Sequence, residues 1–138
     1  MIKYSLLFVS VFTLVFGCKN KYEGIPNISV DIYINIQNPQ YQNLSGMGSW
    51  AYIEGGSKGI IVFNSDNENF LAFERHCPYD SQNSCSRVSV DETNLFAVDS
   101  CCSSKYQLLN GSAIDGPASL PLIGYNTSFD GNIIHIWN

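Results

Sequence analysis

The sequence predicts an all-β protein, either an antiparallel β-sandwich or a small barrel. Three observations predict this class. Apolar and polar residues alternate with a period of two along the first clear segment, short apolar stretches recur between turn signals, and no window shows sustained helical spacing. With 138 residues, the chain has room for one domain with a single modest core.

The strands are expected in order from residue 28. Isoleucine and valine occupy alternate positions from Ile28 to Ile36, which is typical of a half-buried strand. Further strands are expected at Trp50–Ile53, Gly59–Phe63, Phe70–Glu74, Arg87–Val90, Leu95–Val98, Lys105–Leu109, Ile123–Phe129 and Ile133–Trp137. Turn signals separate them, at 55–56, 65–69, 91–94, 110–111 and 130–132. Because they lie along strands, the aromatic residues Phe63, Phe70, Phe73, Phe96 and Phe129 are expected in the core.

Residues 1–17 predict an export signal. Lys3 precedes an apolar run from Leu6 to Phe16, which is too short to span a bilayer as a helix. The segment LVFGC, which ends at Cys18, resembles a bacterial lipobox. The resemblance implies cleavage after Gly17 and lipid attachment through the sulfur of Cys18.

The chain therefore divides into a signal peptide at 1–17, a lipidated cysteine with a polar tether at 18–27, and a β domain at 28–138. The lipid would attach the protein to a membrane of the bacterial cell envelope, facing the periplasm or the cell surface. Seven Lys and Arg residues, one of them in the signal, stand against 12 Asp and Glu residues. This acidic balance argues against nucleic acid as a partner. No feature identifies a protein partner.

Four further cysteines lie in two predicted loops. Cys77 and Cys85 follow the fourth expected strand, and Cys101 and Cys102 follow the sixth. An exported chain meets an oxidising environment, so one interpretation is a pair of disulfides with three possible connectivities. The other is four-thiolate ligation of zinc or of an iron–sulfur cluster. Adjacent side chains diverge in extended backbone, which disfavours a site that needs both Cys101 and Cys102.

The segment SSKYQLLNG, the following GPASLPL and the final DGNIIHIWN occur in a distinctive order. They are similar to the strand, turn and Gly-Pro-Ala succession of the Rieske [2Fe–2S] domain family, and the likeness runs from about Gly59 to Asn138. It implies a Rieske-like antiparallel fold with two cysteine-bearing loops at one end. In that family one loop has the sequence Cys-x-His and the other Cys-x-x-His-Gly-Ser. The cysteines and histidines of both loops are the ligands of the cluster.

The ligand positions of this chain depart from the family. Cys77 stands at the cysteine of the first loop and Tyr79 at its histidine. Asp99 stands at the cysteine of the second loop and Cys102 at its histidine. Because a Rieske centre needs two thiolates and two imidazoles, an ordinary cluster is not expected.

Neither histidine is expected at the site. His76 precedes Cys77, so its side chain should point to the other side of an extended loop. We predict that it is a surface turn histidine. His135 belongs to the last strand, where a place on the sheet surface is the simplest role.

The resemblance also implies disulfides. Some Rieske domains carry a bridge between their two loops, and Cys85 and Cys101 match its positions. Cys77 and Cys102 would then face each other across the vacated site, and we expect a second bridge between them.

The sequence thus predicts a cell-envelope lipoprotein with a degenerate Rieske-type domain, stapled by disulfides, that has a structural or interaction role and no cofactor. One alternative is an electron-transfer protein that binds an atypical [2Fe–2S] cluster through Cys77 and Cys102, with Asp99, Cys85 or Tyr79. Zinc is an alternative occupant of that site. A further alternative is a thiol-redox role for an exchangeable Cys77–Cys102 pair.

Signatures of other enzyme classes are lacking. The sequence contains no recognisable catalytic triad, paired-carboxylate signature or phosphate loop. The glycine-rich segments at 46–50 and 55–59 are predicted to be turns, because neither leads into a helix. Any activity would therefore be that of a redox or electron-transfer component.

Overall fold

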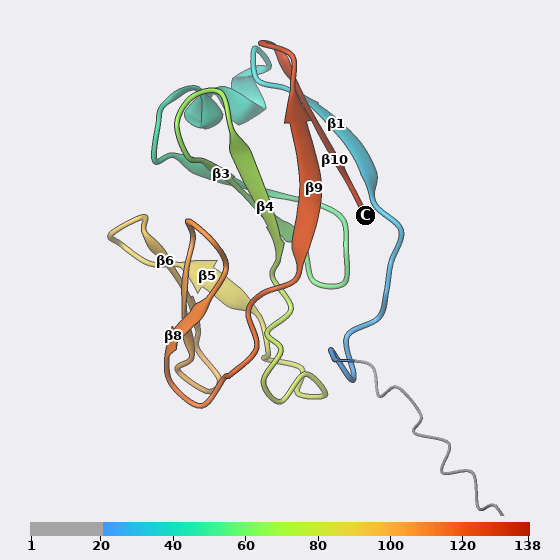
Figure 1. Cartoon of the computed structure of the whole chain (residues 1–138), viewed down its shortest axis with the longest axis vertical. Helices are drawn as coiled ribbons and strands as arrows, with labels where there is room; N and C mark the ends of the chain where they lie inside the picture. Colours follow the sequence, from blue (N-terminus) through green and yellow to red (C-terminus); the bar gives the residue numbers. More distant parts are fainter. Residues whose placement is uncertain (1–20) are drawn as a thin grey trace, which may run out of the picture.

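The computed structural model describes residues 21–138, in which short β-strands, joined by long loops, make up almost all of the regular secondary structure (Figure 1). The larger sheet has the order β1-β10-β9-β4-β3-β2 and the smaller sheet the order β5-β6-β7-β8, with all neighbours antiparallel. The larger sheet contains β1 (Asp31–Asn35), β2 (Trp50–Ile53), β3 (Ile60–Asn64), β4 (Phe70–Glu74), β9 (Gly124–Phe129) and β10 (Ile133–Trp137). The smaller sheet contains β5 (Val88–Val90), β6 (Phe96–Asp99), β7 (Lys105–Gln107) and β8 (Ala113–Asp115). The predicted antiparallel all-β class is confirmed.

The core is divided into two clusters by β3, which is buried along its whole length. Ile60 and Val62 point into the first cluster, which also contains residues of β1, β4 and β10. Ile61 and Phe63 point to the opposite face, as alternate residues of a strand must. There they join a second cluster, which contains residues of β4, of the smaller sheet and of the adjoining loops. The expectation of a single core was therefore wrong, because the smaller sheet covers the second face of β3.

Two elements and several strand ends differ from the sequence-based expectation. The first strand begins at Asp31 instead of Ile28, because its partner β10 ends at Trp137, opposite Asp31. The short 3-10 helix η1 (Pro39–Ser45) was not predicted. The side chain of Asn38 caps it by accepting a hydrogen bond from the amide of Gln40 at 3.2 Å. Strand β8 was also missed, within the loop after the Asn-Gly turn.

The predicted export signal and Cys18 lie outside the described residues. The described part of the predicted tether contacts the domain: Ile25 is buried, and the hydroxyl of Ser81 donates to the carbonyl of Glu23 at 2.8 Å. Within residues 21–138, none of the helical structure is long and apolar enough to cross a membrane.

A buried carboxylate at the end of β4 holds the glycine-rich GGSKG loop in place. Oε2 of Glu74 accepts hydrogen bonds from the amide of Ser57 at 2.7 Å and from the hydroxyl of Tyr125 at 2.8 Å. Oε1 accepts from the amides of Lys58 and His76, both at 2.9 Å. Burial raises the pKa of Tyr125, so its hydroxyl remains a donor. Glu74 thereby fixes Ser57 and Lys58, which hold the cysteine-bearing loop described next.

Candidate functional site

The four cysteines of the domain lie on two loops that approach each other at one end of the smaller sheet. The first cysteine loop, residues 75–87, connects β4 to β5. The second cysteine loop, residues 100–104, connects β6 to β7. Two cysteine-bearing loops at one end of the fold are what the family resemblance implied.

The side chain of Lys58 organises the first cysteine loop. Its ammonium donates hydrogen bonds to the carbonyl oxygens of Asn83 at 3.0 Å, Ser84 at 3.3 Å and Ser86 at 2.9 Å. A lysine ammonium has three donors, so this arrangement uses its full capacity. The hydroxyl of Ser86 in turn donates to the carbonyl of Cys77 at 3.1 Å. These bonds fix the backbone that carries Cys77.

The second cysteine loop is folded around Asp99. Oδ1 of this residue accepts hydrogen bonds from the amides of Cys101 at 2.7 Å and Cys102 at 3.1 Å. Ser103 adopts a left-handed conformation with φ of 61°, and its amide donates to the carbonyl of Asp99 at 2.8 Å. In such a turn the aspartate side chain satisfies the backbone donors that follow it.

A third loop supports the second cysteine loop from behind. Gly116 has φ of 84°, and a Cβ atom at this position would lie 2.6 Å from the Cα atom of Ser104. The residue must therefore be glycine for both its conformation and its close approach. The amide of Ala118 donates to Oγ of Ser104 at 3.1 Å. The Gly-Pro-Ala segment thus positions the loop that carries Cys102.

Cys85 and Cys101 form a disulfide that joins the two cysteine loops, with Cα atoms 5.7 Å apart. This confirms the pairing that the family resemblance implied. Both residues lie at the surface of the domain. The bridge also sends the neighbouring side chains of Cys101 and Cys102 to different partners, as expected for adjacent residues.

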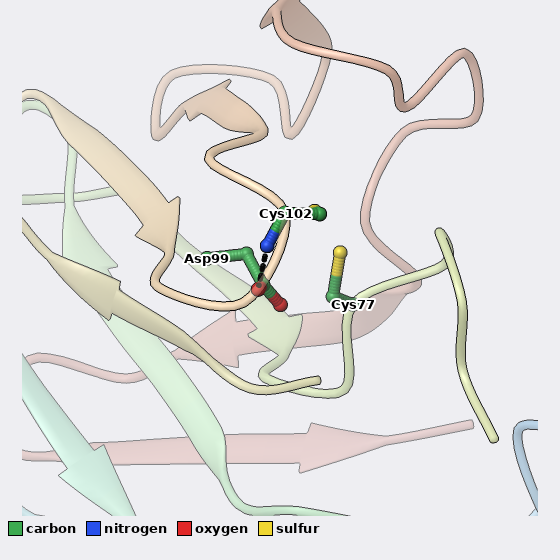
Figure 2. A group of neighbouring side chains, drawn as sticks. All are labelled: Cys77, Asp99 and Cys102. Carbon is green, nitrogen blue, oxygen red and sulfur yellow. Dashed lines mark hydrogen bonds between the residues drawn. The ribbon is translucent and has the colours of Figure 1, made fainter. Parts of the chain in front are cut away.

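Cys77, Asp99 and Cys102 come together and form the candidate site (Figure 2). One ligand atom from each residue, two sulfurs and a carboxylate oxygen, lie within 4.8 Å of one another. Cys77 and Asp99 are fully buried, and Cys102 is half-buried. Tyr79, which stands at the fourth ligand position of the family, is 43% exposed and outside this group.

The carboxylate of Asp99 is unusual among the described residues. Its Oδ2 atom accepts no hydrogen bond from an oxygen or nitrogen donor, and within residues 21–138 no other buried side-chain oxygen or nitrogen lacks a partner. The thiol of Cys77 is the donor that interacts with this carboxylate. Oδ1 carries both of the loop's hydrogen bonds. A buried carboxylate oxygen without an oxygen or nitrogen donor is energetically costly, so this atom points to a missing ligand or proton.

The expected second disulfide, between Cys77 and Cys102, is not formed in the structure, where both residues are free thiols. Each sulfur instead has a hydroxyl partner. The sulfur of Cys77 lies 3.1 Å from the hydroxyl of Tyr106, and the sulfur of Cys102 lies 3.0 Å from that of Ser104. We expected the two thiols to face only each other. In the structure, each thiol has a hydrogen-bond partner in one of these hydroxyls.

Burial raises the pKa of the Cys77 thiol to about 12, against an opposing effect of the hydrogen bond with Tyr106. The nearby Asp99 carboxylate adds to the increase. Burial also raises the pKa of Tyr106, which therefore stays protonated. Because the thiolate is the reactive form of cysteine, this raised pKa lowers the reactivity of Cys77 at neutral pH.

The raised pKa of Cys77 predicts how this thiol reacts with iodoacetamide at pH 8. In protein purified under nitrogen, Cys77 should react on the order of 1,000-fold more slowly in the native state than in urea, since an unperturbed thiol has a pKa near 8.5. Peptide mapping by mass spectrometry follows each cysteine separately, and half-buried Cys102 serves as the internal control. Equal labelling of Cys77 in the native and unfolded chains would contradict its burial as a thiol.

Neither of the chain's two histidines faces the candidate site. The prediction that His76 lies at the surface was wrong: it is 4% exposed. Its Nδ1 is 2.8 Å from Oγ of Ser57 and its Nε2 is 2.7 Å from the carbonyl of Ser81, so both ring nitrogens are occupied. The partner Ser57 is distant in sequence, and nothing near His76 indicated it. His135 lies on the sheet surface as expected, with Nε2 2.7 Å from Asp31.

These residues do not fit a Rieske centre. Such a centre binds two imidazoles at one iron and two thiolates at the other. Here no imidazole is available, and the ligand atoms of Cys77, Asp99 and Cys102 all lie within 4.8 Å of one another. Two thiols and one carboxyl group suit either a single ion or a protonated, ligand-free cluster of side chains.

No family model matches the chain, and neither does a curated protein. Solved structures are similar in fold. The ferredoxin of carbazole 1,9a-dioxygenase from Nocardioides aromaticivorans IC177 is 13% identical, with 78% of this chain and 95% of that chain covered and a TM-score of 0.50. A complex of oxygenase and ferredoxin of carbazole 1,9a-dioxygenase gives 14% identity and a TM-score of 0.54, over 85% of this chain and 30% of that one.

The E. coli protein NirD is 11% identical, with 80% of this chain and 96% of that chain covered and a TM-score of 0.48. At such low identities the similarity to solved structures concerns the fold alone. The chain has a Rieske-like fold, as the sequence resemblance implied.

Tyr106 and Ser104 were not predicted to belong to the site. Both are fully buried although their side chains are polar. The signal that could have found Tyr106 is the alternation in β7, where the residue between Lys105 and Gln107 must point inward. Nothing comparable indicated Ser104, whose partner is the sulfur two residues before it.

Proposed function

We propose that this chain is a lipoprotein of the bacterial cell envelope, anchored through Cys18, whose Rieske-like domain has lost the Rieske cluster and serves a structural or interaction role. The observation that carries this proposal is the position of the two histidines, both of which are engaged away from Cys77, Asp99 and Cys102. Without imidazole ligands the domain lacks the donors that define a Rieske centre and raise its potential.

The two loops are also held by contacts that require no cluster. The Cys85–Cys101 disulfide joins the loops covalently. Lys58 fixes the first loop through three carbonyls, and Asp99 closes the second through two amides. An exposed disulfide is also what an exported chain can maintain, since the compartments outside the cytosol are oxidising.

Back-substitution tests the loss of the cluster. The triple variant Tyr79→His, Asp99→Cys and Cys102→His restores the family's residue types around Cys77. After anaerobic reconstitution with iron and sulfide, this variant should bind more iron than the wild-type chain and develop the visible absorption of a two-iron centre. The wild-type chain should bind no more iron than its Cys77→Ala variant. Stoichiometric two-iron uptake by the wild type, lost in Cys77→Ala, would favour the electron-transfer alternative.

Fractionation of cells tests the anchor. The wild-type chain should be found in the membrane fraction, because several acyl chains on one residue anchor a protein stably. The Cys18→Ser variant should appear in the soluble fraction or as an unprocessed precursor. Wild-type protein that is unmodified at Cys18 and free in the periplasm or the medium would refute the proposal.

A further inference from the structure

We propose that Cys77, Asp99 and Cys102 bind one zinc ion, with the two thiolates and Oδ2 of Asp99 as its ligands. The inference rests on the proposed loss of the cluster, because an iron–sulfur cluster would occupy the same residues and exclude zinc. It assigns a ligand to a group of side chains that does not fit a Rieske centre.

The carboxylate of Asp99 is already oriented as a ligand that binds through one oxygen. Its Oδ1 accepts hydrogen bonds from the amides of Cys101 and Cys102, which fix the plane of the group. Its Oδ2 accepts no hydrogen bond from an oxygen or nitrogen donor, although the residue has no exposed surface. A cation at Oδ2 would remove the cost of this unsatisfied oxygen.

Both sulfurs are likewise placed to act as thiolates. The hydroxyl of Tyr106 lies 3.1 Å from the sulfur of Cys77 and that of Ser104 lies 3.0 Å from the sulfur of Cys102. When a metal holds the thiolates, these hydroxyls can donate hydrogen bonds to them. Hydrogen bonds of this kind orient metal ligands and stabilise their charge. The amide of Ala118 also donates to Oγ of Ser104, so this hydroxyl is itself fixed.

The geometry suits one ion of this chemical class. Two thiolates on a tetrahedral zinc ion lie about 3.8 Å apart, since each Zn–S bond is about 2.3 Å. The three ligand atoms lie within 4.8 Å of one another, so small movements of the side chains close the site. Thiolates disfavour Mg²⁺ and Ca²⁺, and the carboxylate disfavours Cu⁺. Zinc is the best match, because Zn²⁺ accepts both thiolate and carboxylate ligands in a four-coordinate site.

Binding is an exchange of protons for the metal and involves no redox change. Zn²⁺ forms bonds to both sulfurs and to the carboxylate, and the thiol protons of Cys77 and Cys102 pass to the solvent. Three protein ligands leave one coordination position for water. A Cys77–Cys102 disulfide would have no thiolates to offer, so oxidation of the pair and zinc binding exclude each other.

The experiment uses the full chain purified in detergent, stripped of metal with a chelator and handled under nitrogen. Free thiols are counted first, so that oxidised protein is not titrated. Zinc chloride is then titrated by calorimetry, and cobalt chloride is added to a second sample as a spectroscopic probe. We expect one zinc per chain, a higher melting temperature with zinc, and thiolate-to-cobalt charge-transfer absorption.

Variants identify the ligands. Cys77→Ser and Cys102→Ser should each abolish the charge-transfer absorption or reduce its intensity by about half, because each removes one of two thiolates. Asp99→Asn keeps an oxygen that can accept from the loop amides, but it replaces Oδ2 by an uncharged NH₂ group that cannot bind zinc. This variant should weaken zinc binding by about tenfold or more. Asp91→Asn is the matched control, because this aspartate lies in an exposed turn of the same sheet and pairs with Lys105 at 3.5 Å.

The outcomes separate this inference from the proposed function. Two irons in the wild-type site would overturn both. A colourless, iron-free protein with two free thiols that binds neither zinc nor cobalt would overturn only the inference. Zinc binding that persists unchanged in both cysteine variants would also overturn it, because the ion would then lie elsewhere. The cobalt spectrum of the wild type tests the inference even if a variant fails to fold.

Discussion

Replacing Cys85 and Cys101 together by alanine should lower the free energy of unfolding by about 3 kcal/mol. The disulfide closes a loop with a sequence separation of 16 residues. Opening such a loop raises the conformational entropy of the unfolded chain, which stabilises the unfolded state by about 3 kcal/mol. For a domain of this size the melting temperature should fall by roughly 10 °C. Thermal and urea unfolding, followed by circular dichroism, measure both quantities.

A reductant provides the control for the disulfide. Both cysteines are at the surface, so a phosphine reductant should destabilise the wild-type domain to the level of the double variant. The double variant itself should be unaffected by the reductant. A wild-type domain that loses less than about 1 kcal/mol on reduction would contradict the role of this bridge in holding the loops together.

Glu74→Ala should destabilise the domain by at least about 3 kcal/mol. The side chain is 1% exposed and accepts four hydrogen bonds, from the amides of Ser57, Lys58 and His76 and the hydroxyl of Tyr125. Its removal leaves these four donors without an acceptor, one in a buried contact and three in partly buried ones, and an unsatisfied buried donor costs about 1–3 kcal/mol. Urea unfolding at pH 7 measures the change.

Tyr125→Phe is the matched control for the carboxylate, because it removes one of the four donors and leaves the acceptor in place. Its cost should be about 1 kcal/mol. The GGSKG loop should also lose order in Glu74→Ala, which hydrogen exchange at Ser57 and Lys58 would detect. An alanine variant as stable as Tyr125→Phe would show that water replaces the carboxylate, contrary to the role assigned to Glu74.

Alternation and turn signals predicted most of the fold because burial in a sheet is periodic. The segment Ile60–Asn64 illustrates both the strength and the limit of this signal. Its continuous apolar run was predicted correctly to be a strand, but which sheet covers its second face depends on distant residues. The helix at Pro39–Ser45 was missed, since it has no apolar periodicity and depends on one capping side chain.

The site was predictable to the level of backbone positions and not of side-chain contacts. The family resemblance placed Cys77, Asp99 and Cys102 together, and it paired Cys85 with Cys101. The state of the thiols depends on the hydroxyl groups beside them, and no sequence spacing encodes those contacts. His76 was misplaced for the same reason, because its burial depends on a serine 19 positions earlier in the chain.

The visible absorption spectrum of the wild-type full chain, purified without exposure to air and analysed for iron in the same sample, tests the central claim most directly. The claim is that a Rieske-like fold here carries a site without a Rieske centre. We expect a colourless protein without stoichiometric iron. A brown protein with two irons per chain and the absorption of a [2Fe–2S] centre would contradict the claim.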